Sequence, residues 1–313
     1  MTEPYELDAC AARDAISKSA LSPVELVSSC ISRIERVDPS LNAVVANCFN
    51  RALDEAKKAE RAVGSGVKLG PLHGLPILIK DLQDTKDLRT TYGSLLYKDH
   101  VPEKDESNVS VLREAGAIIL GKSNTPEFGA GAHTVNKVYG ATGNPFDTNR
   151  TCGGSSGGSA VALAANMVPL ASGSDSGGSL RIPAAYCGVV AHRSTPGIVP
   201  TERHSIGYTN YSVQGPMART VADTQLMLST LARYDDRDPL STPWARERFK
   251  KSVSVDLSDL KVAFCDDLGF AEVDDGLRSI FWERVEHLKP LFKSWVDAAP
   301  NLLDVRRCNW VLR

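Results

Sequence analysis

Two glycine–serine segments, each bordered by apolar residues, place the strongest constraint on how this chain folds. Residues 153–159 read Gly-Gly-Ser-Ser-Gly-Gly-Ser, and residues 175–179 read Asp-Ser-Gly-Gly-Ser. Apolar runs at 160–165 and 167–171 separate them, whereas a flexible glycine–serine linker would not lie between core elements. We therefore expect both segments to be ordered, with glycine allowing positive φ angles and close backbone approach.

A candidate base lies upstream of these segments. The apolar run at 75–79 is typical of a buried strand and ends on Lys80. A serine hydroxyl is a poor nucleophile until a base removes its proton, and a lysine can be that base when burial keeps it neutral. Asp81 need not hold Lys80 charged, because neighbours on a strand point to opposite faces. The alternative interpretation, that Lys80 merely leaves the strand for water, would be preferred for an isolated lysine.

The second glycine–serine segment could supply an oxyanion site. Acyl transfer places negative charge on a carbonyl oxygen, and backbone N–H groups directed at that oxygen stabilise it. The consecutive candidate donors are Ser176, Gly177, Gly178 and Ser179. With Lys80, they indicate a serine nucleophile that is activated by a lysine rather than by a histidine.

These residues resemble the amidase signature family of serine hydrolases. Lys80 matches the family's lysine, Ser155 its serine after a cis peptide bond, and Ser179 its nucleophile. We expect the side chains of Lys80 and Ser155, and those of Ser155 and Ser179, to lie within about hydrogen-bond reach, with looser spacing in the absence of substrate. Further matching stretches lie at 70–81, 121–128, 140–145 and 214–223, so that the resemblance covers residues from about 21 to 231.

The resemblance implies a fold, a site and an activity. The fold is α/β, with a central mixed β-sheet covered by helices. The activity is hydrolysis of a carboxylic amide through an acyl-Ser179 intermediate, with no metal or organic cofactor. The position of the loop after residue 127 in the family implies that the substrate pocket is lined by Phe128, Gly129, Ala130 and Gly131.

The remaining sequence agrees with an α/β fold, because helical and strand patterns alternate. Residues 22–25, Ser-Pro-Val-Glu, form a capping box with proline at the first helical position. Thr220 and Asp223 are spaced as a second capping box. Helices are also predicted around 51–62, 109–115, 220–231 and 277–288, the last of them ended or kinked by Pro290, and strands at 117–120 and 260–264.

The chain departs from the family in length, at Ser176, where the family commonly has threonine or a small apolar residue, and at one further stretch of sequence. Residues 191–195 read Ala-His-Arg-Ser-Thr, where the family usually has Gly-Leu-Lys-Pro-Thr. Family members are usually much longer than 313 residues, and residues 309–313 look like the inside of another element. We expect a single domain over 1–313 that lacks its C-terminal portion.

Composition and charge limit which kinds of partner and which cellular compartment we expect for this protein. The net charge of −2 comes with no basic stripe, so a nucleic-acid partner is not expected. No apolar run reaches the ~18 residues that would cross a membrane, and residues 1–6 lack signal-peptide features. Seven scattered cysteines indicate free thiols, and the histidines lack metal-ligand spacing. We expect a cytoplasmic enzyme for a small amide, which could form a homodimer.

Other functions stay open at this point. The nearest is the amidase component of a tRNA-dependent amidotransferase, which releases ammonia from glutamine, although residues 211–216 look more like free-standing amidases. A non-catalytic fragment is favoured by the short length and opposed by the presence of the complete catalytic triad, Lys80, Ser155 and Ser179. An α/β-hydrolase is rejected, because its Gly-x-Ser-x-Gly turn follows a strand and residues 147–150 are a poor strand. His73 is interpreted as a turn residue.

Overall fold

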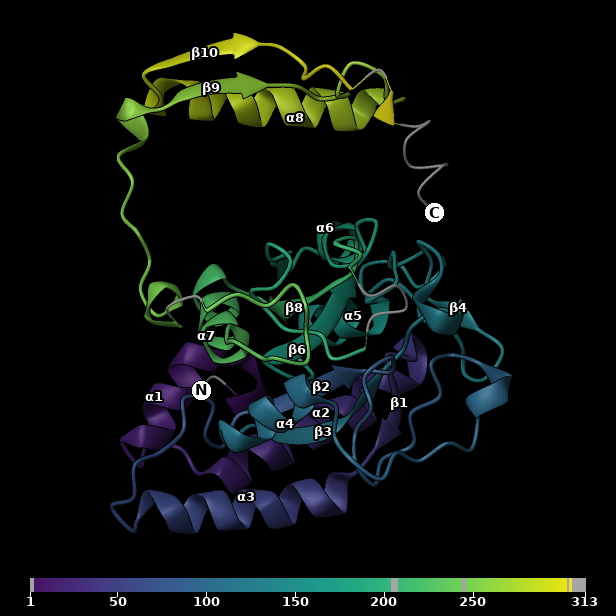
Figure 1. Cartoon of the computed structure of the whole chain (residues 1–313), viewed down its shortest axis with the longest axis vertical. Helices are drawn as coiled ribbons and strands as arrows, with labels where there is room; N and C mark the ends of the chain where they lie inside the picture. The colour runs from purple at the N-terminus through teal and green to yellow at the C-terminus, as the bar shows by residue number, and fades with distance from the viewer. Residues whose placement is uncertain (1–2, 204–207, 244–245, 303, 306–313) are drawn as a thin grey trace. The chain divides into compact units, whose positions relative to one another are not determined.

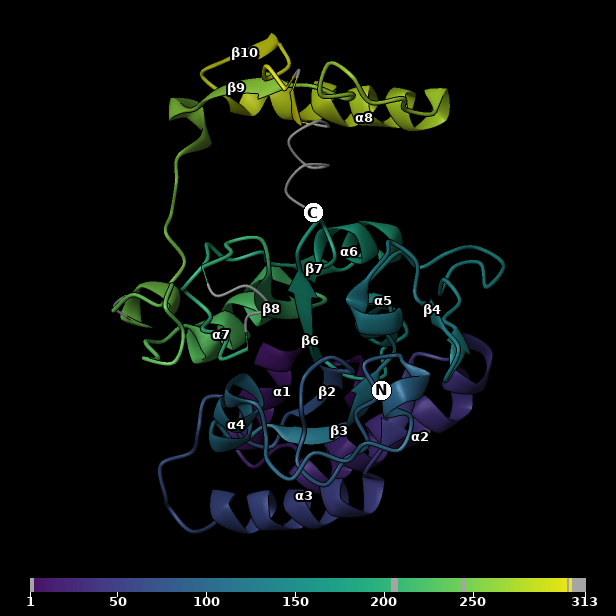
Figure 2. The same ribbon diagram turned by 45° about the vertical axis from the view of Figure 1, so that its right-hand side comes forward.

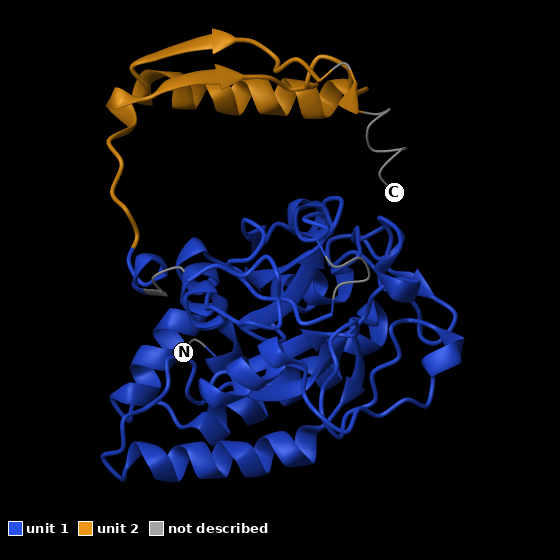
Figure 3. Cartoon of the chain, in the orientation of Figure 1, with its two compact units in different colours: residues 1–251 blue, residues 252–313 orange. Residues whose placement is uncertain are grey.

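The computed structural model describes residues 3–203, 208–243, 246–302 and 304–305. The chain forms two compact units, unit 1 over residues 1–251 and unit 2 over residues 252–313 (Figure 3). The stretch 309–313, which was expected to belong to another element, lies outside the described residues. That both units belong to one domain stays a prediction.

A mixed sheet forms the centre of unit 1 (Figure 1). In the described residues it has six strands in the order β1-β3-β2-β6-β8-β7. Strand β2 pairs in parallel with β3 and β6, and the remaining pairs are antiparallel. The strands are β1 Val44–Asn47, β2 Pro76–Lys80, β3 Ile118–Ser123, β6 Leu170–Asp175, β7 Val190–Ala191 and β8 Val213–Ala218, with a separate ladder of β4 Val135–Asn136 and β5 Gly140–Ala141.

Helices pack on this sheet, which confirms the predicted α/β architecture. Helix α5 contacts β2, β3, β6 and β8, while α7 contacts β6, β7 and β8. The helices of unit 1 are α1 Ala9–Ser17, α2 Pro23–Leu41, α3 Phe49–Val63, α4 Ser107–Glu114, α5 Gly157–Ala164, α6 Arg181–Cys187 and α7 Val221–Leu231, with the 3-10 turns η1 Pro4–Glu6, η2 Leu95–Tyr97, η3 Glu127–Gly129 and η4 Arg246–Phe249. In the part of the chain that the structure describes, no helix is both long and apolar enough to span a membrane.

The two predicted capping boxes have different outcomes. The first is confirmed: Ser22 caps α2 and exchanges hydrogen bonds with Glu25, and Pro23 is the first helical residue. At α7 the Thr220 side chain accepts the N–H of Asp223, as expected. The second half of that box is wrong, because the Asp223 carboxylate accepts the N–H of Cys10 at 2.8 Å instead. This bond joins the start of α1 to the start of α7.

The sheet explains why the polar ends of two strands meet. Strands β2 and β6 are neighbours (Figure 2) and run in parallel. Their C-terminal residues, Lys80 and Asp175, therefore lie at the same edge of the sheet. Every residue of β2 is buried, including Lys80. A run of Pro-Ile-Leu-Ile in the middle of a sheet is buried on both faces, and it takes the following lysine into the interior with it.

Unit 2 is a strand–helix–strand unit. Strands β9 Lys261–Phe264 and β10 Ser294–Asp297 pair in parallel, and α8 Asp275–Leu288 connects them. The predicted strand near 260–264 and the helix that ends before Pro290 are therefore confirmed. The 3-10 turns of this unit are η5 Leu257–Asp259 and η6 Lys289–Leu291.

Candidate active site

Lys80 is buried, and its amine lies at the centre of three serine hydroxyls. Its Nζ lies 2.7 Å from Oγ of Ser155, 2.8 Å from Oγ of Ser156 and 2.9 Å from Oγ of Ser174. The side chain has no exposed surface, so the interpretation that Lys80 leaves the strand for water is wrong. The predicted contact between Lys80 and Ser155 is present.

Burial changes the acid–base character of Lys80. Desolvation lowers the pKa of Lys80 from 10.5 to about 7, and the negative charge of Asp175 opposes this shift. Asp81 does not hold Lys80 charged, because its carboxylate accepts the N–H and the O–H of Thr91. A substantial fraction of the Lys80 amine is therefore neutral near pH 7 and can accept a proton.

Ser155 follows a cis peptide bond, as the resemblance implied for Gly154–Ser155. Ser155 is buried. Glycine fits closely before it, because a Cβ on residue 154 would lie only 3.0 Å from the backbone nitrogen of His133 and would have to displace it slightly. This close backbone packing accounts for the glycine in the first glycine–serine segment.

Ser179 lies in the turn between β6 and α6. Its carbonyl oxygen accepts the N–H of Ser156 at 3.2 Å, which ties the two glycine–serine segments together. Gly178 has a φ of +109°, and a Cβ there would lie 2.8 Å from Cδ1 of Ile182, so the turn requires glycine. In the described residues no hydrogen bond joins the side chains of Ser155 and Ser179, so their expected proximity stays a prediction. The backbone bond brings the two segments together, and the Ser179 side chain is left half-buried.

One expected oxyanion donor is already engaged. The N–H of Gly178 donates to Oδ1 of Asp175 at 2.8 Å, and the N–H of Leu180 donates to Oδ2 at 3.1 Å. Within the described chain, the N–H groups of Ser176, Gly177 and Ser179 have no hydrogen-bond acceptor. The candidate donors are therefore these three, without Gly178.

Asp175 is a site residue that the sequence did not reveal. Its buried carboxylate pairs with Nε of Arg181 at 3.0 Å and with Nη1 of Arg193 at 3.0 Å. Burial alone would raise the pKa of Asp175, but the hydrogen bonds from Arg181, Gly178 and Leu180 outweigh it and hold the pKa at about 2. The only signal in the sequence was its position directly before the Ser-Gly-Gly-Ser turn.

Ser156 and Ser174 were also missed as partners of Lys80. The Ser156 hydroxyl donates to the carbonyl of Ser174 at 3.2 Å, so it can only accept from Lys80. The N–H of Ser174 donates back to Oγ of Ser156 at 3.2 Å. These two serines are therefore held in place around the amine.

The loop predicted to line the pocket lies beside Ser155. A Cβ on Gly129 would lie 3.5 Å from Oγ of Ser155. Phe128 precedes it with 54% of its surface exposed, and its ring packs edge-on against Tyr97 at 6.1 Å. Ala130 is exposed on the same loop. Apolar surface is thus available next to the serine.

His73 lies in a structural position. Its Nε2 lies 2.9 Å from the carbonyl oxygen of Ala59, which belongs to α3. A Cβ on Gly116 would lie 2.7 Å from the Cα of His73, so the histidine packs tightly against a turn. These contacts fit the interpretation of His73 as a turn residue.

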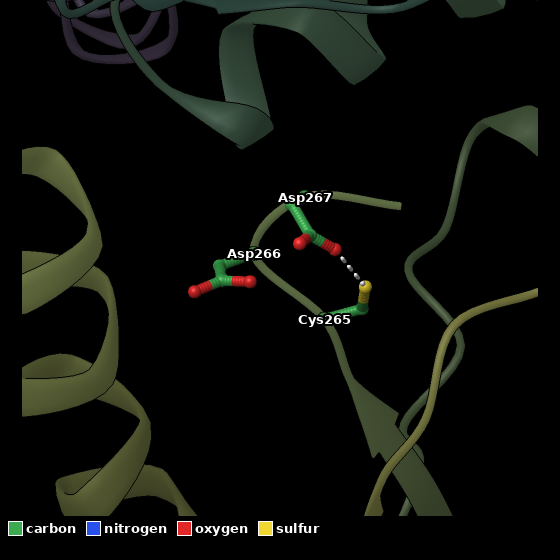
Figure 4. Close-up of side chains that lie close together, drawn as sticks. All are labelled: Cys265, Asp266 and Asp267. Atoms are coloured by element: carbon green, nitrogen blue, oxygen red, sulfur yellow. Dashed lines mark hydrogen bonds between the residues drawn. The ribbon is translucent and has the colours of Figure 1, made fainter. Parts of the chain in front are cut away.

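A separate cluster in unit 2 consists of Cys265, Asp266 and Asp267 (Figure 4). Asp266 accepts hydrogen bonds from Arg278 at 2.9 Å and from Trp282 at 2.8 Å. Asp267 accepts from the thiol of Cys265 and from the N–H of Gly269 at 2.7 Å. These bonds close the turn after β9 and account for the cluster.

The chain is an α/β protein with a central mixed sheet. Its candidate site combines a buried lysine at the end of a central strand with a serine that follows a cis peptide bond. The chain belongs to the amidase family, whose profile, described as Amidase, matches residues 25–304.

The chain is similar to other proteins of this family. An acylamidase of Rhodococcus erythropolis is 38% identical over 295 residues, which cover 94% of this chain and 62% of that protein. A glutamyl-tRNA(Gln) amidotransferase subunit of Chloroflexus aurantiacus is 36% identical over 300 residues, which cover 96% and 61%. The structure of a peptide amidase from Stenotrophomonas maltophilia matches with a TM-score of 0.80 at 30% identity and covers 95% and 63%. The chain thus spans less than two thirds of these relatives' length.

Proposed function

We propose that this protein hydrolyses a carboxylic amide, with Ser179 as nucleophile, Ser155 as proton relay and Lys80 as base. The observation that carries the proposal is the fully buried Lys80 amine, 2.7 Å from Ser155, with its pKa lowered by burial to about 7. A base with a pKa near the working pH is suited to proton transfer.

The hydroxyls around Lys80 orient its amine. A neutral amine has two N–H donors and one lone pair. Ser156 and Ser174 lie 2.8 Å and 2.9 Å from Nζ and accept the two N–H groups. The lone pair then faces Ser155, so that the Ser155 hydroxyl can give its proton to Lys80.

The first half of the reaction forms an acyl-enzyme. Ser179 turns its hydroxyl toward Ser155 and attacks the amide carbonyl, while Ser155 takes the Ser179 proton and passes its own to Lys80. The N–H groups of Ser176, Gly177 and Ser179 stabilise the oxyanion. The C–N bond then breaks, and the amine leaves with the proton that Lys80 returns through Ser155.

The second half regenerates the enzyme. A water molecule attacks the acyl-Ser179 ester and transfers one proton through Ser155 to Lys80. The C–O bond to Ser179 breaks, Ser179 regains a proton through the same relay, and the carboxylic acid leaves. The proposed reaction uses one water molecule and yields one acid and one amine or ammonia.

The exposed Phe128 and its neighbour Tyr97 support a substrate with an apolar group beside the amide. The similarity to an acylamidase agrees with this choice. We also place the protein in the cytoplasm, where the cysteines, which are free among the described residues, would remain reduced.

A second candidate is a glutaminase component that delivers ammonia to a partner in a tRNA-dependent amidotransferase. The 36% identity to a glutamyl-tRNA(Gln) amidotransferase subunit supports it. Hydrolysis of glutamine that rises when a partner and charged tRNA are added would favour this candidate over a free-standing amidase.

The test is a panel of aryl, alkyl and primary amides, with mass spectrometry of the protein during turnover. We expect an acyl group on the peptide that contains Ser179, and loss of both turnover and adduct in Ser179→Ala. Ser176→Ala is the matched control, because it changes a neighbouring exposed serine but keeps its backbone N–H. Turnover that survives Ser179→Ala would contradict the proposed nucleophile, and no turnover of any amide would favour a non-catalytic role.

A further inference from the structure

The pairing of strands β2 and β6 ends two residues before Lys80, which carries the candidate base. Their ladder pairs Ile77 with Leu170 and Leu78 with Ala171, and no later pair is formed between these two strands. The N–H of Lys80 donates to the side-chain Oγ of Ser172 at 2.9 Å. A side chain of β6, rather than its backbone, therefore holds the backbone of Lys80.

Ser172 is the first member of a buried chain of side chains. Its hydroxyl donates to Oε1 of Gln83, and Nε2 of Gln83 donates to Oε1 of Gln214 at 2.5 Å. Nε2 of Gln214 then donates to Oε1 of Glu106. All four residues are buried. Every donor from Lys80 onward points toward Glu106, and a carboxylate can only accept.

The orientation of the Gln214 amide in this series of hydrogen bonds is also fixed by Asn108. Nδ2 of Asn108 donates to the same Oε1 of Gln214 at 2.7 Å, and Nη1 of Arg233 donates to Oδ1 of Asn108 at 2.7 Å. If the Gln214 amide turned over, its NH₂ group would face two donors. A buried amide in that state would lose its partners, at a cost typical of unsatisfied polar groups.

The backbone of Gln83 is anchored as well. Its N–H donates to the carbonyl of Lys80 at 3.0 Å, and its carbonyl accepts from Nζ of the buried Lys122. Gln83 therefore contacts the Lys80 segment twice, once through its backbone and once through Ser172. Its side chain joins Ser172 on β6 to Gln214 on β8.

We propose that Gln83 is a positioning residue for the reaction: by holding the hydroxyl of Ser172, it keeps the Lys80 backbone where the Lys80 amine meets Ser155. This inference rests on the proposed function of Lys80. Without the Gln83 amide oxygen, the Ser172 hydroxyl loses its hydrogen-bond acceptor, and it turns away from the Lys80 N–H. The amine then shifts from Ser155, and water reaches it.

The experiment compares Gln83→Leu with Thr90→Val and with the unaltered protein. Thr90 is a matched control, because its buried hydroxyl donates only to the nearby carbonyl of Leu88. The Lys80 side-chain resonance, assigned from its absence in Lys80→Met, is titrated by NMR, and kcat and KM are measured on an amide. In Gln83→Leu we expect the Lys80 titration to move up by about one pH unit as water enters, and kcat to fall about tenfold or more with KM little changed.

Ser172→Ala is a second variant that keeps the test decisive if Gln83→Leu does not fold. It removes only the hydroxyl that holds the Lys80 N–H, and we expect the same upward shift in the titration. Folded Gln83→Leu or Ser172→Ala protein with an unchanged Lys80 titration would overturn the proposal, as would an equal shift in Thr90→Val. If the unaltered protein hydrolyses no amide, the proposed function fails, while the titration still decides the positioning role.

Discussion

The carboxylate of Asp175 accepts the backbone N–H of Gly178 at 2.8 Å, one residue before the proposed nucleophile. The same carboxylate pairs with Arg181 and Arg193, which follow it by 6 and 18 residues. A single buried acid thus holds the turn, the start of α6 and a more distant loop. We infer that Asp175 shapes the turn on which Ser179 lies.

The first prediction concerns the Asp175→Asn variant, which keeps the size of the side chain and removes its charge. Two arginines and the N–H groups of Gly178 and Leu180 would lose a charged acceptor, so we expect the free energy of unfolding to fall by about 2 kcal/mol. The loss is smaller than for a fully buried ion pair, because the side chains of Arg181 and Arg193 are 58% and 25% exposed and stay hydrated. Denaturant unfolding measures this loss. Asp147→Asn is the control, because Asp147 forms an exposed pair with Arg150, and it should leave the free energy of unfolding almost unchanged.

The pH dependence of the same interaction has a defined sign. The pKa of Asp175 is lowered from 3.8 to about 2 in the folded state. Its stabilisation is therefore fully present above the unfolded pKa of 3.8 and is lost as the pH falls through about 2. Asp175→Asn protein should lack this component of acid unfolding. Identical acid-unfolding curves for the variant and the unaltered protein would contradict the role of Asp175.

The second prediction concerns Ser174, which accepts from the Lys80 amine at 2.9 Å. In Ser174→Ala one N–H of the neutral amine has no acceptor and the lone pair is less well directed, so we expect kcat to fall about tenfold. The ammonium also loses an acceptor, which lowers the pKa of Lys80 and moves the acidic limb of the rate profile to lower pH. Ser174→Thr, which keeps the hydroxyl, should retain most of the rate. An unchanged kcat and pH profile in Ser174→Ala would rule out this role.

The local sequence pattern predicted that Lys80 is buried, and the family resemblance predicted its partner Ser155. The apolar run before Lys80 predicted a buried strand, and burial of that strand takes the lysine into the interior. The glycine–serine spacing, through the family resemblance, placed Ser155 next to the lysine and predicted the cis bond. The burial of Lys80 depends on one short stretch of chain, whereas its pairing with Ser155, 75 residues away, could be predicted only through the family resemblance.

The missed features depend on partners far apart in sequence. The sequence around Asp175 does not show that Arg193 pairs with its carboxylate. The role of Gln83 likewise depends on Gln214, which is 131 residues away. The loss of Gly178 as an oxyanion donor follows from the same acid. Hydrophobic periodicity describes which residues are buried, but it does not say which buried polar groups pair.

The third prediction is the pH dependence of turnover. Lys80 must be neutral to accept a proton, and its pKa is lowered by burial to about 7. We therefore expect kcat/KM to fall as the pH drops below about 7, with no contribution from a histidine. Lys80→Ala should leave only a residual rate from the oxyanion donors and from substrate binding. His73→Ala should keep the acidic limb; loss of that limb in folded His73→Ala protein, with Lys80→Ala still active, would make a histidine the base.

The fourth prediction separates the two serines by covalent labelling. A fluorophosphonate places a phosphoryl oxygen where the oxyanion would lie, so it should react with the serine beside the free N–H groups. We expect it to label Ser179 and not Ser155, which is buried and bonded to Lys80. Mass spectrometry of the labelled peptides gives the site, and Ser156→Ala, which leaves both serines in place, is the control for disturbance of the lysine environment. Labelling should disappear in Ser179→Ala and should be slowed but retained at Ser179 in Ser155→Ala, because the relay is lost and the nucleophile remains. Labelling that survives Ser179→Ala and disappears in Ser155→Ala would show that the roles of the two serines are reversed.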